Sequence, residues 1–384
     1  MIPSVSYSND PYRRIGIFLA IIILIRCRPF YLWDYEDFLR PLCAVIVTMI
    51  ALFNLSKDKL SIPIFICLAS SYIWATIFVD RSSIVTVLNF LGFAFIPLIK
   101  KELVLSTYES FRKIYIVIIA VSFVSYLLAS MGLFYLGNFT HQNGPDLYTY
   151  EHFPFLVRGL GKMEDFNMRF QSLFDEAGIV GTISGLLLIS QRMDFTRRGN
   201  VILLICSLFT LSFYFYISLF LGIVFFSSRL HKHRWKILLL FVIFIVVTYR
   251  LPFFYDNLWY RFEYDAETGS LVGDNRNGWG LKDYYNSIVW TPVFFTGLGS
   301  TFAEQFSGAA SLNLVIVKHG LIFVLFNVSA YLLLSYREIT HKPTWLVFIF
   351  FFILTLYQRP GFYATYSIFL YTMVIYKFGK SNPN

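Results

Sequence analysis

Charged residues are scarce in this chain. Only 14% of its 384 residues are charged, whereas an ordinary soluble domain has about 25%. Hydrophobic residues make up 57% of the sequence, and the mean hydropathy is +0.61. This balance excludes an ordinary soluble globular protein, because too few polar side chains remain for a surface that faces water. We therefore expect an integral membrane protein.

Cysteine is also rare, and the motifs of several enzyme classes are missing. Every cysteine lies in or beside an apolar segment, and none forms a CxxC pair. We therefore expect small buried side chains rather than disulfides or thiolate metal sites. The sequence has no HExxH, P-loop or GxSxG motif, so it gives no reason to expect a metal or a cofactor. The cysteines are Cys27, Cys43, Cys67 and Cys206.

The net charge of +9 raises the question of a nucleic-acid partner. The basic residues lie mostly in short stretches between apolar segments. Membrane proteins place Lys and Arg in this way in their cytoplasmic loops. We therefore attribute the charge to membrane topology and expect no nucleic-acid partner.

Apolar segments of membrane length recur along the chain. A transmembrane helix needs about 20 apolar residues, with about 17 as a practical minimum. Arg13 and Arg14 precede the first segment as in a signal peptide, but no cleavage site follows, so we expect an uncleaved first helix. The sequence predicts an all-α, polytopic membrane protein with about twelve transmembrane helices in one domain, 1–384. The candidate segments are 15–33, 38–56, 62–79, 83–99, 113–134, 174–191, 200–213, 214–228, 236–251, 311–335, 344–358 and 360–376.

The basic clusters predict how the chain crosses the membrane. All of them lie in the cytoplasm only if 200–228 and 344–376 each cross the bilayer twice. The Arg359-Pro360-Gly361 triplet then forms the turn between the last two crossings. Both termini are expected in the cytoplasm. Two long loops, 137–172 and 251–310, are expected on the outer face, where most of the remaining polar residues gather.

The first outer loop leads into three charged residues. Arg169 precedes an apolar helix, and Asp175 and Glu176 stand at its first turn. Carboxylates there either cap free backbone N–H groups or act as acid–base groups at the membrane surface. Small residues follow on the same helix, and they suit either close helix packing or a lipid-linked substrate beside that face. They are Gly178, Gly181, Ser184 and Gly185.

Arginines are unexpectedly frequent in the two outer loops. The guanidinium group suits planar, bidentate recognition of phosphate, although an arginine in a loop is often only a solvated charge. Outer arginines are uncommon under the positive-inside rule. We therefore interpret the set as a cluster suited to a diphosphate at the membrane surface. Its members are Arg158, Arg169, Arg261 and Arg276.

A glycine-rich turn and a polar helix follow the second loop. Gly297-Leu298-Gly299 allows close approach to a ligand, although a GxG sequence alone is not specific. Asn313 opens the next apolar segment, and His319 lies inside it. For His319 two interpretations stay open, a structural hydrogen bond or a functional role at a cavity.

The order of these features resembles the polytopic O-antigen polymerase and O-antigen ligase superfamily. That family has an R-x-x-(G/S)-x-F-(D/E)-(P/E) stretch, a loop with an essential arginine, a G-x-G turn, an N-x-x-(L/V) helix entry and a (K/Y)-G-(I/L) close. The likeness covers about 165–335 by motif, and His319 is an extra residue in the closing motif. The similar stretches here are Arg169-Phe170-Gln171-Ser172-Leu173-Phe174-Asp175-Glu176, Arg276, Gly297-Leu298-Gly299, Asn313 and Lys318-His319-Gly320-Leu321.

The resemblance implies a GT-C-like glycosyltransferase of the bacterial inner membrane. Such an enzyme polymerises undecaprenyl-diphosphate-linked repeat units into O-antigen or capsular polysaccharide at the periplasmic face. The resemblance implies that no metal or cofactor is needed. It also implies a chain-length regulator and a flippase as partners. Arg169 and Arg276 would stabilise the departing diphosphate, and Glu176, or alternatively Asp175, would activate the acceptor hydroxyl. The further substrate-binding residues are Arg158, Arg261, Asn313 and Gly299.

Two other functions stay open. O-antigen ligases use the same donor, but they commonly carry a histidine just before the helix-entry asparagine. Ser311-Leu312 stand there in this chain, which favours the polymerase. A lipid-linked oligosaccharide flippase or other transporter is expected to carry charges inside several spans. This chain concentrates its polar residues in the two outer loops instead. The motifs specify neither the sugars nor the linkage.

Overall fold

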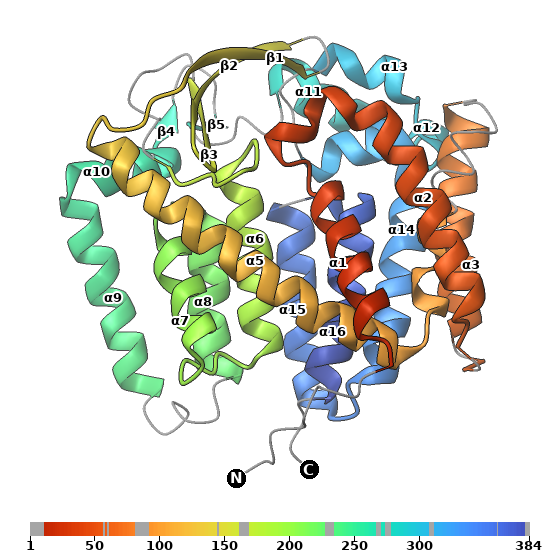
Figure 1. The fold of residues 1–384 in the computed structure, drawn as a ribbon. Coiled ribbons are helices and arrows are strands. Elements are labelled where there is room, and N and C mark those ends of the chain that lie inside the picture. The colour runs from red at the N-terminus through yellow and green to blue at the C-terminus, as the bar shows by residue number, and fades with distance from the viewer. Residues whose placement is uncertain are drawn as a thin grey trace.

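The computed structural model of the chain is mostly helical (Figure 1). It describes residues 11–56, 58–59, 61–80, 92–143, 146–160, 169–226, 234–265, 270–272, 278–306, 311–358 and 360–380. The longer helices are α1 (Arg13–Arg26), α2 (Glu36–Phe53), α3 (Ser61–Ile73), α5 (Lys101–Ser130), α6 (Ala177–Ser190), α7 (Arg198–Leu208), α8 (Phe213–Phe226), α9 (Arg234–Arg250), α14 (Leu312–Glu338), α15 (Lys342–Gln358) and α16 (Thr365–Lys380).

Three helical segments among the described residues are long and apolar enough to cross a membrane. They are α5, α14, and α3 with its π-helical continuation η3 (Trp74–Val79). A fourth arises if α1 and Phe30–Phe53, which meet at a 94° bend, count as one span. Several other apolar helices have 10–17 residues. The structure thus confirms a helical protein with apolar helices of membrane-spanning length, while the count of about twelve spans stays a prediction.

Two of the expected boundaries move furthest. The helix expected over 113–134 begins at Lys101, because Arg112 is buried and donates from Nη2 to Asn200 Oδ1 at 2.8 Å. A tertiary partner therefore allows a charged residue that hydropathy assigns to a loop. The first segment, expected over 15–33, ends at Arg26 and turns sharply into the next helix.

One end of the helical bundle gathers basic residues, and we call it the basic end. Lys100 lies over the ring of Tyr12, and Lys101 pairs with Glu338. Lys377 Nζ lies 2.6 Å from Glu109 Oε1. These contacts bring the starts of α1 and α5 together with the ends of α14 and α16, at the bottom of Figure 1. Members of two of the expected basic clusters therefore meet here, whereas the gathering of all the clusters on one face and its cytoplasmic placement stay predictions.

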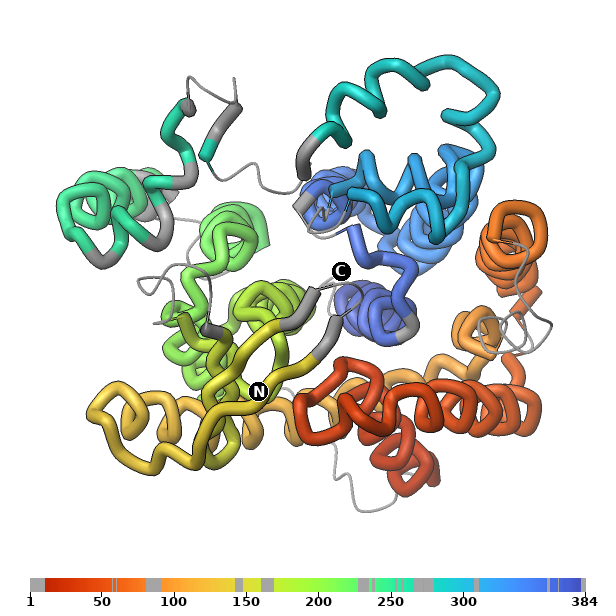
Figure 2. Tube along the Cα trace, turned by 90° about the horizontal axis from the view of Figure 1, so that it is seen from above, coloured from red at the N-terminus to blue at the C-terminus, as the bar shows by residue number. Residues whose placement is uncertain are grey.

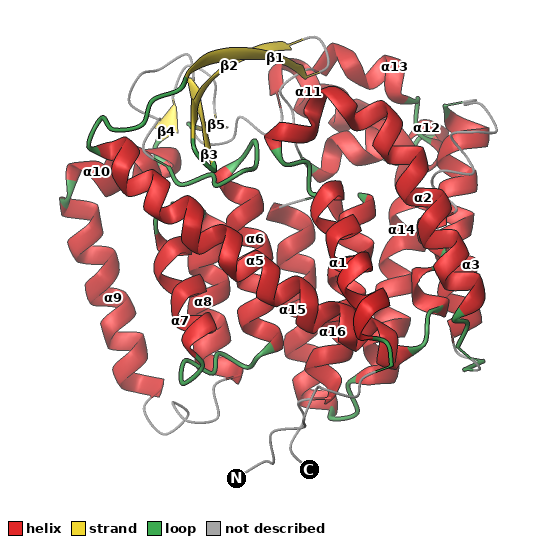
Figure 3. Ribbon diagram, viewed as in Figure 1, coloured by secondary structure: helices red, strands yellow, loops and turns green. Residues whose placement is uncertain are grey.

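The opposite end carries a small β-sheet, and we call it the sheet end (Figure 3). Strands β1 (Gly137–Asn143), β2 (Asp146–Phe153) and β3 (Leu156–Leu160) pair antiparallel in that order. The all-α expectation is therefore wrong for the first long loop. The overlooked signal is the Tyr, Thr and Phe content of the two runs on either side of residue 144, because these residue types favour strands.

The second expected loop, 251–310, is also largely structured. It contains α10 (Pro252–Phe254), α11 (Gly278–Ile288), α12 (Pro292–Thr296), α13 (Ser300–Ala303) and a short pair of strands, β4 (Tyr264–Asp265) and β5 (Ser270–Leu271). Leu281 and Ile288 of α11 are buried with Phe306 and Val317. An apolar face on α11 therefore anchors this region to α14.

Helix α16 lies between α6 and α14 at the centre of the bundle (Figure 2). The small face of α6 packs against α8. A Cβ added at Gly181 would lie 2.6 Å from Ser212 Cβ, and one at Gly185 would lie 3.3 Å from Ser218 Cβ. Close helix packing therefore accounts for these two glycines, because α8 already fills the space that a substrate would need.

Candidate functional site

The segment 169–176, which carries the arginine-to-glutamate motif, lies at a junction of four elements at the sheet end. We call it the motif segment. Its backbone and one hydroxyl group form hydrogen bonds with β3, with the α1–α2 turn, with α5 and with the α7–α8 turn. The bonds are Phe170 N to Phe209 O at 2.9 Å, Val157 N to Ser172 O at 3.0 Å, Phe30 N to Leu173 O at 2.9 Å, and Ser172 Oγ to Ser122 Oγ at 2.9 Å.

The sequence of the motif segment explains this position. Phe170, Ser172 and Phe174 are almost fully buried, so alternate side chains enter the core. Ser172 has a φ of 57°, a left-handed conformation that costs a non-glycine residue roughly 1–2 kcal/mol. Its hydroxyl bond to Ser122 helps to hold that conformation. The charged residues are left at the two ends of an otherwise buried segment.

Arg169, at the first end, contacts the turn between α7 and α8. Its Nε donates to Thr210 O at 3.0 Å, and its Nη2 donates to Leu211 O at 3.4 Å. Carbonyl groups after the last turn of a helix lack helical partners, and arginine often satisfies them. A structural role for Arg169 is therefore established, whereas its expected contact with a diphosphate stays a prediction.

Asp175 and Glu176, at the other end, lie just before α6. Glu176 is the N-cap residue, but its side chain makes no capping hydrogen bond, and the first turn contains no acidic residue. The expectation that both carboxylates stand in the first turn is therefore wrong, and side-chain capping does not account for Glu176. Glu176 is exposed and Asp175 is half-buried.

The charges of both carboxylates affect the pKa of Tyr150 in β2. Burial raises the pKa of Tyr150 to about 12, and the charges of Asp175 and Glu176 add to the increase. Arg28 acts in the opposite direction on the same phenol. Tyr150 therefore keeps its proton at neutral pH and remains a hydrogen-bond donor.

The other three arginines expected at the site differ in where they lie and in how much of each the structure describes. Arg158 of β3 pairs with Glu151 on the neighbouring strand, and its guanidinium lies 5.5 Å from the ring centre of Phe153. This arginine joins two strands of the sheet. Arg261 belongs to a short 3-10 turn, Tyr260–Phe262. Its side chain, and the whole of Arg276, lie outside the described residues.

The glycine turn 297–299 packs against a break in α14. Gly320 has φ 82° and ψ 161°, so the expected continuous helix is interrupted there. Leu298 N donates to Val317 O and Gly299 N donates to Lys318 O, both at 2.9 Å. The turn thereby satisfies carbonyl groups that the break leaves without helical partners. In the structure, the GxG sequence therefore forms backbone hydrogen bonds with residues about twenty positions later in the chain.

Steric contact explains why glycine stands on both sides of this pairing. A Cβ at Gly297 would lie 2.6 Å from Gly320 N, and one at Gly320 would lie 2.3 Å from Phe295 O. At Gly299 a Cβ would lie 3.2 Å from Asp80 Oδ1, which also accepts a hydrogen bond from Ser300 N. The carboxylate of Asp80 and the carbonyl group of Val79 therefore lie close to Gly299, and its contact with a ligand stays a prediction.

His319 lies beside the break, inside α14. It is 6% exposed, and its ring packs against Phe323 and Tyr363 with centroid distances of 4.7 and 5.5 Å. Its Nδ1 lies 4.0 Å from Asp80 Oδ2, too far for a hydrogen bond. Within the described part of the chain this nitrogen has no hydrogen-bond partner. Asn313 is half-buried at the second position of the same helix, whose start is capped by Ser311.

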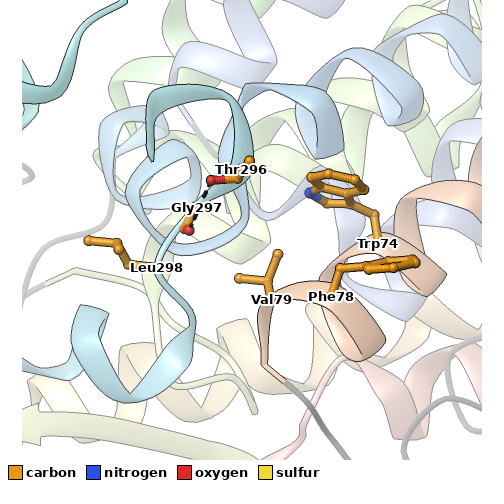
Figure 4. A pocket seen from close by; sticks show the side chains of 6 residues that line it. All are labelled: Trp74, Phe78, Val79, Thr296, Gly297 and Leu298. Carbon is orange, nitrogen blue, oxygen red and sulfur yellow. Dashed lines mark hydrogen bonds between the residues drawn. The ribbon is translucent and has the colours of Figure 1, made fainter. Parts of the chain in front are cut away.

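A pocket of about 370 Å³ lies beside the glycine turn (Figure 4). Phe78 in its wall is 66% exposed, so the pocket borders an apolar side of the molecule. Thr296 Oγ1 points back to Pro292 O at 3.1 Å. The lining is thus mainly apolar and aromatic. It consists of Trp74, Phe78, Val79, Thr296, Gly297 and Leu298.

An arginine pair at the α1–α2 turn was not nominated from the sequence. Arg28 Nη2 lies 2.7 Å from Glu36 Oε2, and Arg40 Nη2 lies 2.6 Å from Glu36 Oε1. The sequence analysis assigned Arg28 to the first transmembrane segment. The available signal was a third nearby arginine, Arg26, in a stretch where the positive-inside rule disfavours positive charge.

Neither metal-binding geometry nor known relatives identify the site further. Among the described residues, no group of three or more His, Cys, Asp or Glu side chains is placed to hold a metal ion. Comparison with protein-family models, with curated proteins and with solved structures finds no match to this chain. The functional argument therefore rests on the motifs and on the geometry of the sheet end.

Proposed function

We propose that the chain is a membrane glycosyltransferase that polymerises undecaprenyl-diphosphate-linked repeat units, with the sheet end at the periplasmic face. One observation carries the proposal. The motif segment is held rigidly on four sides, yet it ends in an exposed carboxylate, Glu176, that makes no capping bond. A firmly held backbone that presents an exposed carboxylate is what a site for activating a hydroxyl requires.

The proposed reaction assigns one task to each end of the site. The carboxylate of Glu176, or alternatively of Asp175, takes the proton from an acceptor sugar hydroxyl. The hydroxyl oxygen bonds to the anomeric carbon of the donor, and the bond from that carbon to the diphosphate breaks. The diphosphate leaves with the electron pair, and arginine stabilises its charge. Arg276 and Arg169 are the expected arginines, and Tyr150 is a neutral donor beside the base.

A flippase or other transporter is the second candidate, and the interruption of α14 favours it. Discontinuous helices with buried polar groups are typical of transporter binding sites. Here the break at Gly320 lies next to buried His319 and the carboxylate of Asp80. The proposal of a polymerase is preferred because the glycine turn fills the break, as the two hydrogen bonds at 2.9 Å show. O-antigen ligase remains the alternative that shares the donor.

A lipopolysaccharide gel from a deletion strain tests the proposal. Complementation with the wild-type gene should restore a ladder, whereas Glu176→Gln should leave a single band of core plus one repeat unit. A full ladder in the deletion strain would reject the polymerase. Loss of even the one-unit band would indicate ligation or flipping instead. Immunoblots of the membrane fraction establish equal amounts of both proteins.

A further inference from the structure

Two guanidinium groups share one carboxylate at the turn between α1 and α2. Glu36 accepts Arg28 on one oxygen and Arg40 on the other, at 2.7 and 2.6 Å. A carboxylate used in this way fixes the directions of both side chains while it neutralises only one of the two charges. The arginine pair thus keeps a net positive charge and several N–H donors for a further anion.

Arg28 in particular has unused hydrogen-bonding capacity. Its Nε is buried and has no hydrogen-bond partner within the described ranges. Its backbone is in the left-handed region, with a φ of 59°, and Trp33 Nε1 donates to its carbonyl oxygen at 2.9 Å. A buried donor without a partner destabilises the protein, because the desolvation of its N–H group is not offset by a hydrogen bond. A strained residue with such a donor is typical of a position selected for binding.

The surroundings keep the positive charge in excess. Arg26 is buried, and the charges of Arg40, Glu36 and Arg28 act on its guanidinium group. The neighbouring carboxylates of Asp34 and Asp37 are exposed, and neither forms an ion pair with the cluster. Partial burial strengthens the attraction of such a cluster for an anion, because water screens it less.

The pair also borders the proposed catalytic carboxylates. The α1–α2 turn is joined to the sheet by an aromatic cluster, in which Phe30 and Trp33 pack against Phe139 and Tyr150. Phe30 N bonds to Leu173 O, two residues before Asp175. Tyr150 interacts with Arg28 and with Asp175. A diphosphate held by the arginine pair would therefore lie at the same junction of the α1–α2 turn, the sheet and the motif segment.

We infer that Arg28 and Arg40, oriented by Glu36, form a binding site for the diphosphate of a polyprenyl-linked ligand. The lipid part of this assignment rests on the proposed function, whereas the anion part rests on the arginine geometry alone. The pair supplies at the described sheet end the phosphate recognition that the sequence analysis sought in the two outer loops.

Ligand binding to the full-length protein in phosphatidylcholine nanodiscs tests this inference. The probes are geranylgeranyl diphosphate and, without the lipid chain, inorganic pyrophosphate. We expect Arg28→Ala and Arg40→Ala each to weaken binding of both probes about tenfold or more, as for the loss of a charge-assisted hydrogen bond. Glu36 keeps one arginine in each variant, so both should fold. Arg197→Ala at the basic end, which also removes an ion-paired arginine, is the matched control and should bind as the wild type does.

The outcomes separate this inference from the proposed function. Unchanged binding in both arginine variants overturns the site. Loss of diphosphate binding in nanodiscs that contain phosphatidylglycerol also overturns it, because the pair would then bind ordinary anionic headgroups. Arginine-dependent binding by a protein that never forms polymer supports the site and rejects the polymerase. If Arg28→Ala and Arg40→Ala both form polymer and bind both probes normally, the diphosphate site is rejected but the polymerase is not.

Discussion

The motif segment 169–176 and the glycine turn 297–299 both match short family motifs, yet they use their residues in opposite ways. The motif segment buries its aromatic residues and leaves Glu176 exposed at its end. The glycine turn directs its N–H groups into the break of α14 and leaves no space for a side chain. A matched motif therefore indicates a position in the fold, and only the contacts show whether it binds a ligand or another part of the chain.

The largest expected effect comes from Gly320→Ala. Alanine would adopt a φ of 82° with its Cβ 2.3 Å from Phe295 O, which is backbone and cannot rotate away. We expect a loss of roughly 3 kcal/mol or more of folding free energy, seen as loss of the monodisperse peak in size-exclusion chromatography.

Gly132→Ala is the matched control for this change. Gly132 has a φ of 74°, but no atom lies within 4 Å of its added Cβ. Only the conformational cost of about 1 kcal/mol remains there. Equal damage from both substitutions would show that backbone conformation, and not the contact with the glycine turn, determines the effect.

The next largest effect is on activity. Glu176→Gln should reduce polymer formation by about 10²-fold or more, because a positioned general base contributes about that factor. Thermal unfolding should change little, because the exchange keeps the size of an exposed side chain. Asp175→Asn is the comparison variant. Should Asp175→Asn give the greater loss at equal protein level, the roles of the two carboxylates would be reversed.

Arg169→Ala should lower stability more modestly. It removes two donors from the carbonyl groups of Thr210 and Leu211, with an expected cost of about 1–3 kcal/mol. Arg169→Lys keeps the charge and one donor. If the lysine variant regains stability but not polymer formation, Arg169 also contacts the substrate. If the lysine variant regains both stability and polymer formation, Arg169 acts only by stabilising the α7–α8 turn.

The smallest effect concerns alkaline pH. The pKa of Tyr150 is raised to about 12 by burial and by neighbouring carboxylates, above the unfolded value of about 10. Its contribution to stability is therefore complete below about pH 10 and is lost as the pH rises through 12. Between pH 9 and 11, the melting temperature of Tyr150→Phe should fall less than that of the wild type. Identical slopes would contradict the burial of the phenol between the sheet and the motif segment.

The sequence by itself determined the helical, membrane-type character of the chain and the position of most long helices. Residue composition and the length of apolar runs are local properties, so α2 and α15 follow from reading along the chain. The motif segment was also found in this way, together with Asp175 and Glu176, because its residues are contiguous.

Tertiary structure decided the features that depend on partners distant in sequence. The break at Gly320 is satisfied by Leu298 and Gly299, and Arg169 by carbonyl groups about forty residues later. Arg40 contacts Glu36 within α2, whereas Arg28 contacts the same carboxylate across the 94° bend between α1 and Phe30–Phe53. Hydropathy measures how much a residue prefers lipid to water. It does not predict which hydrogen-bond partner a buried polar group will have. That choice follows from the packing of the whole chain.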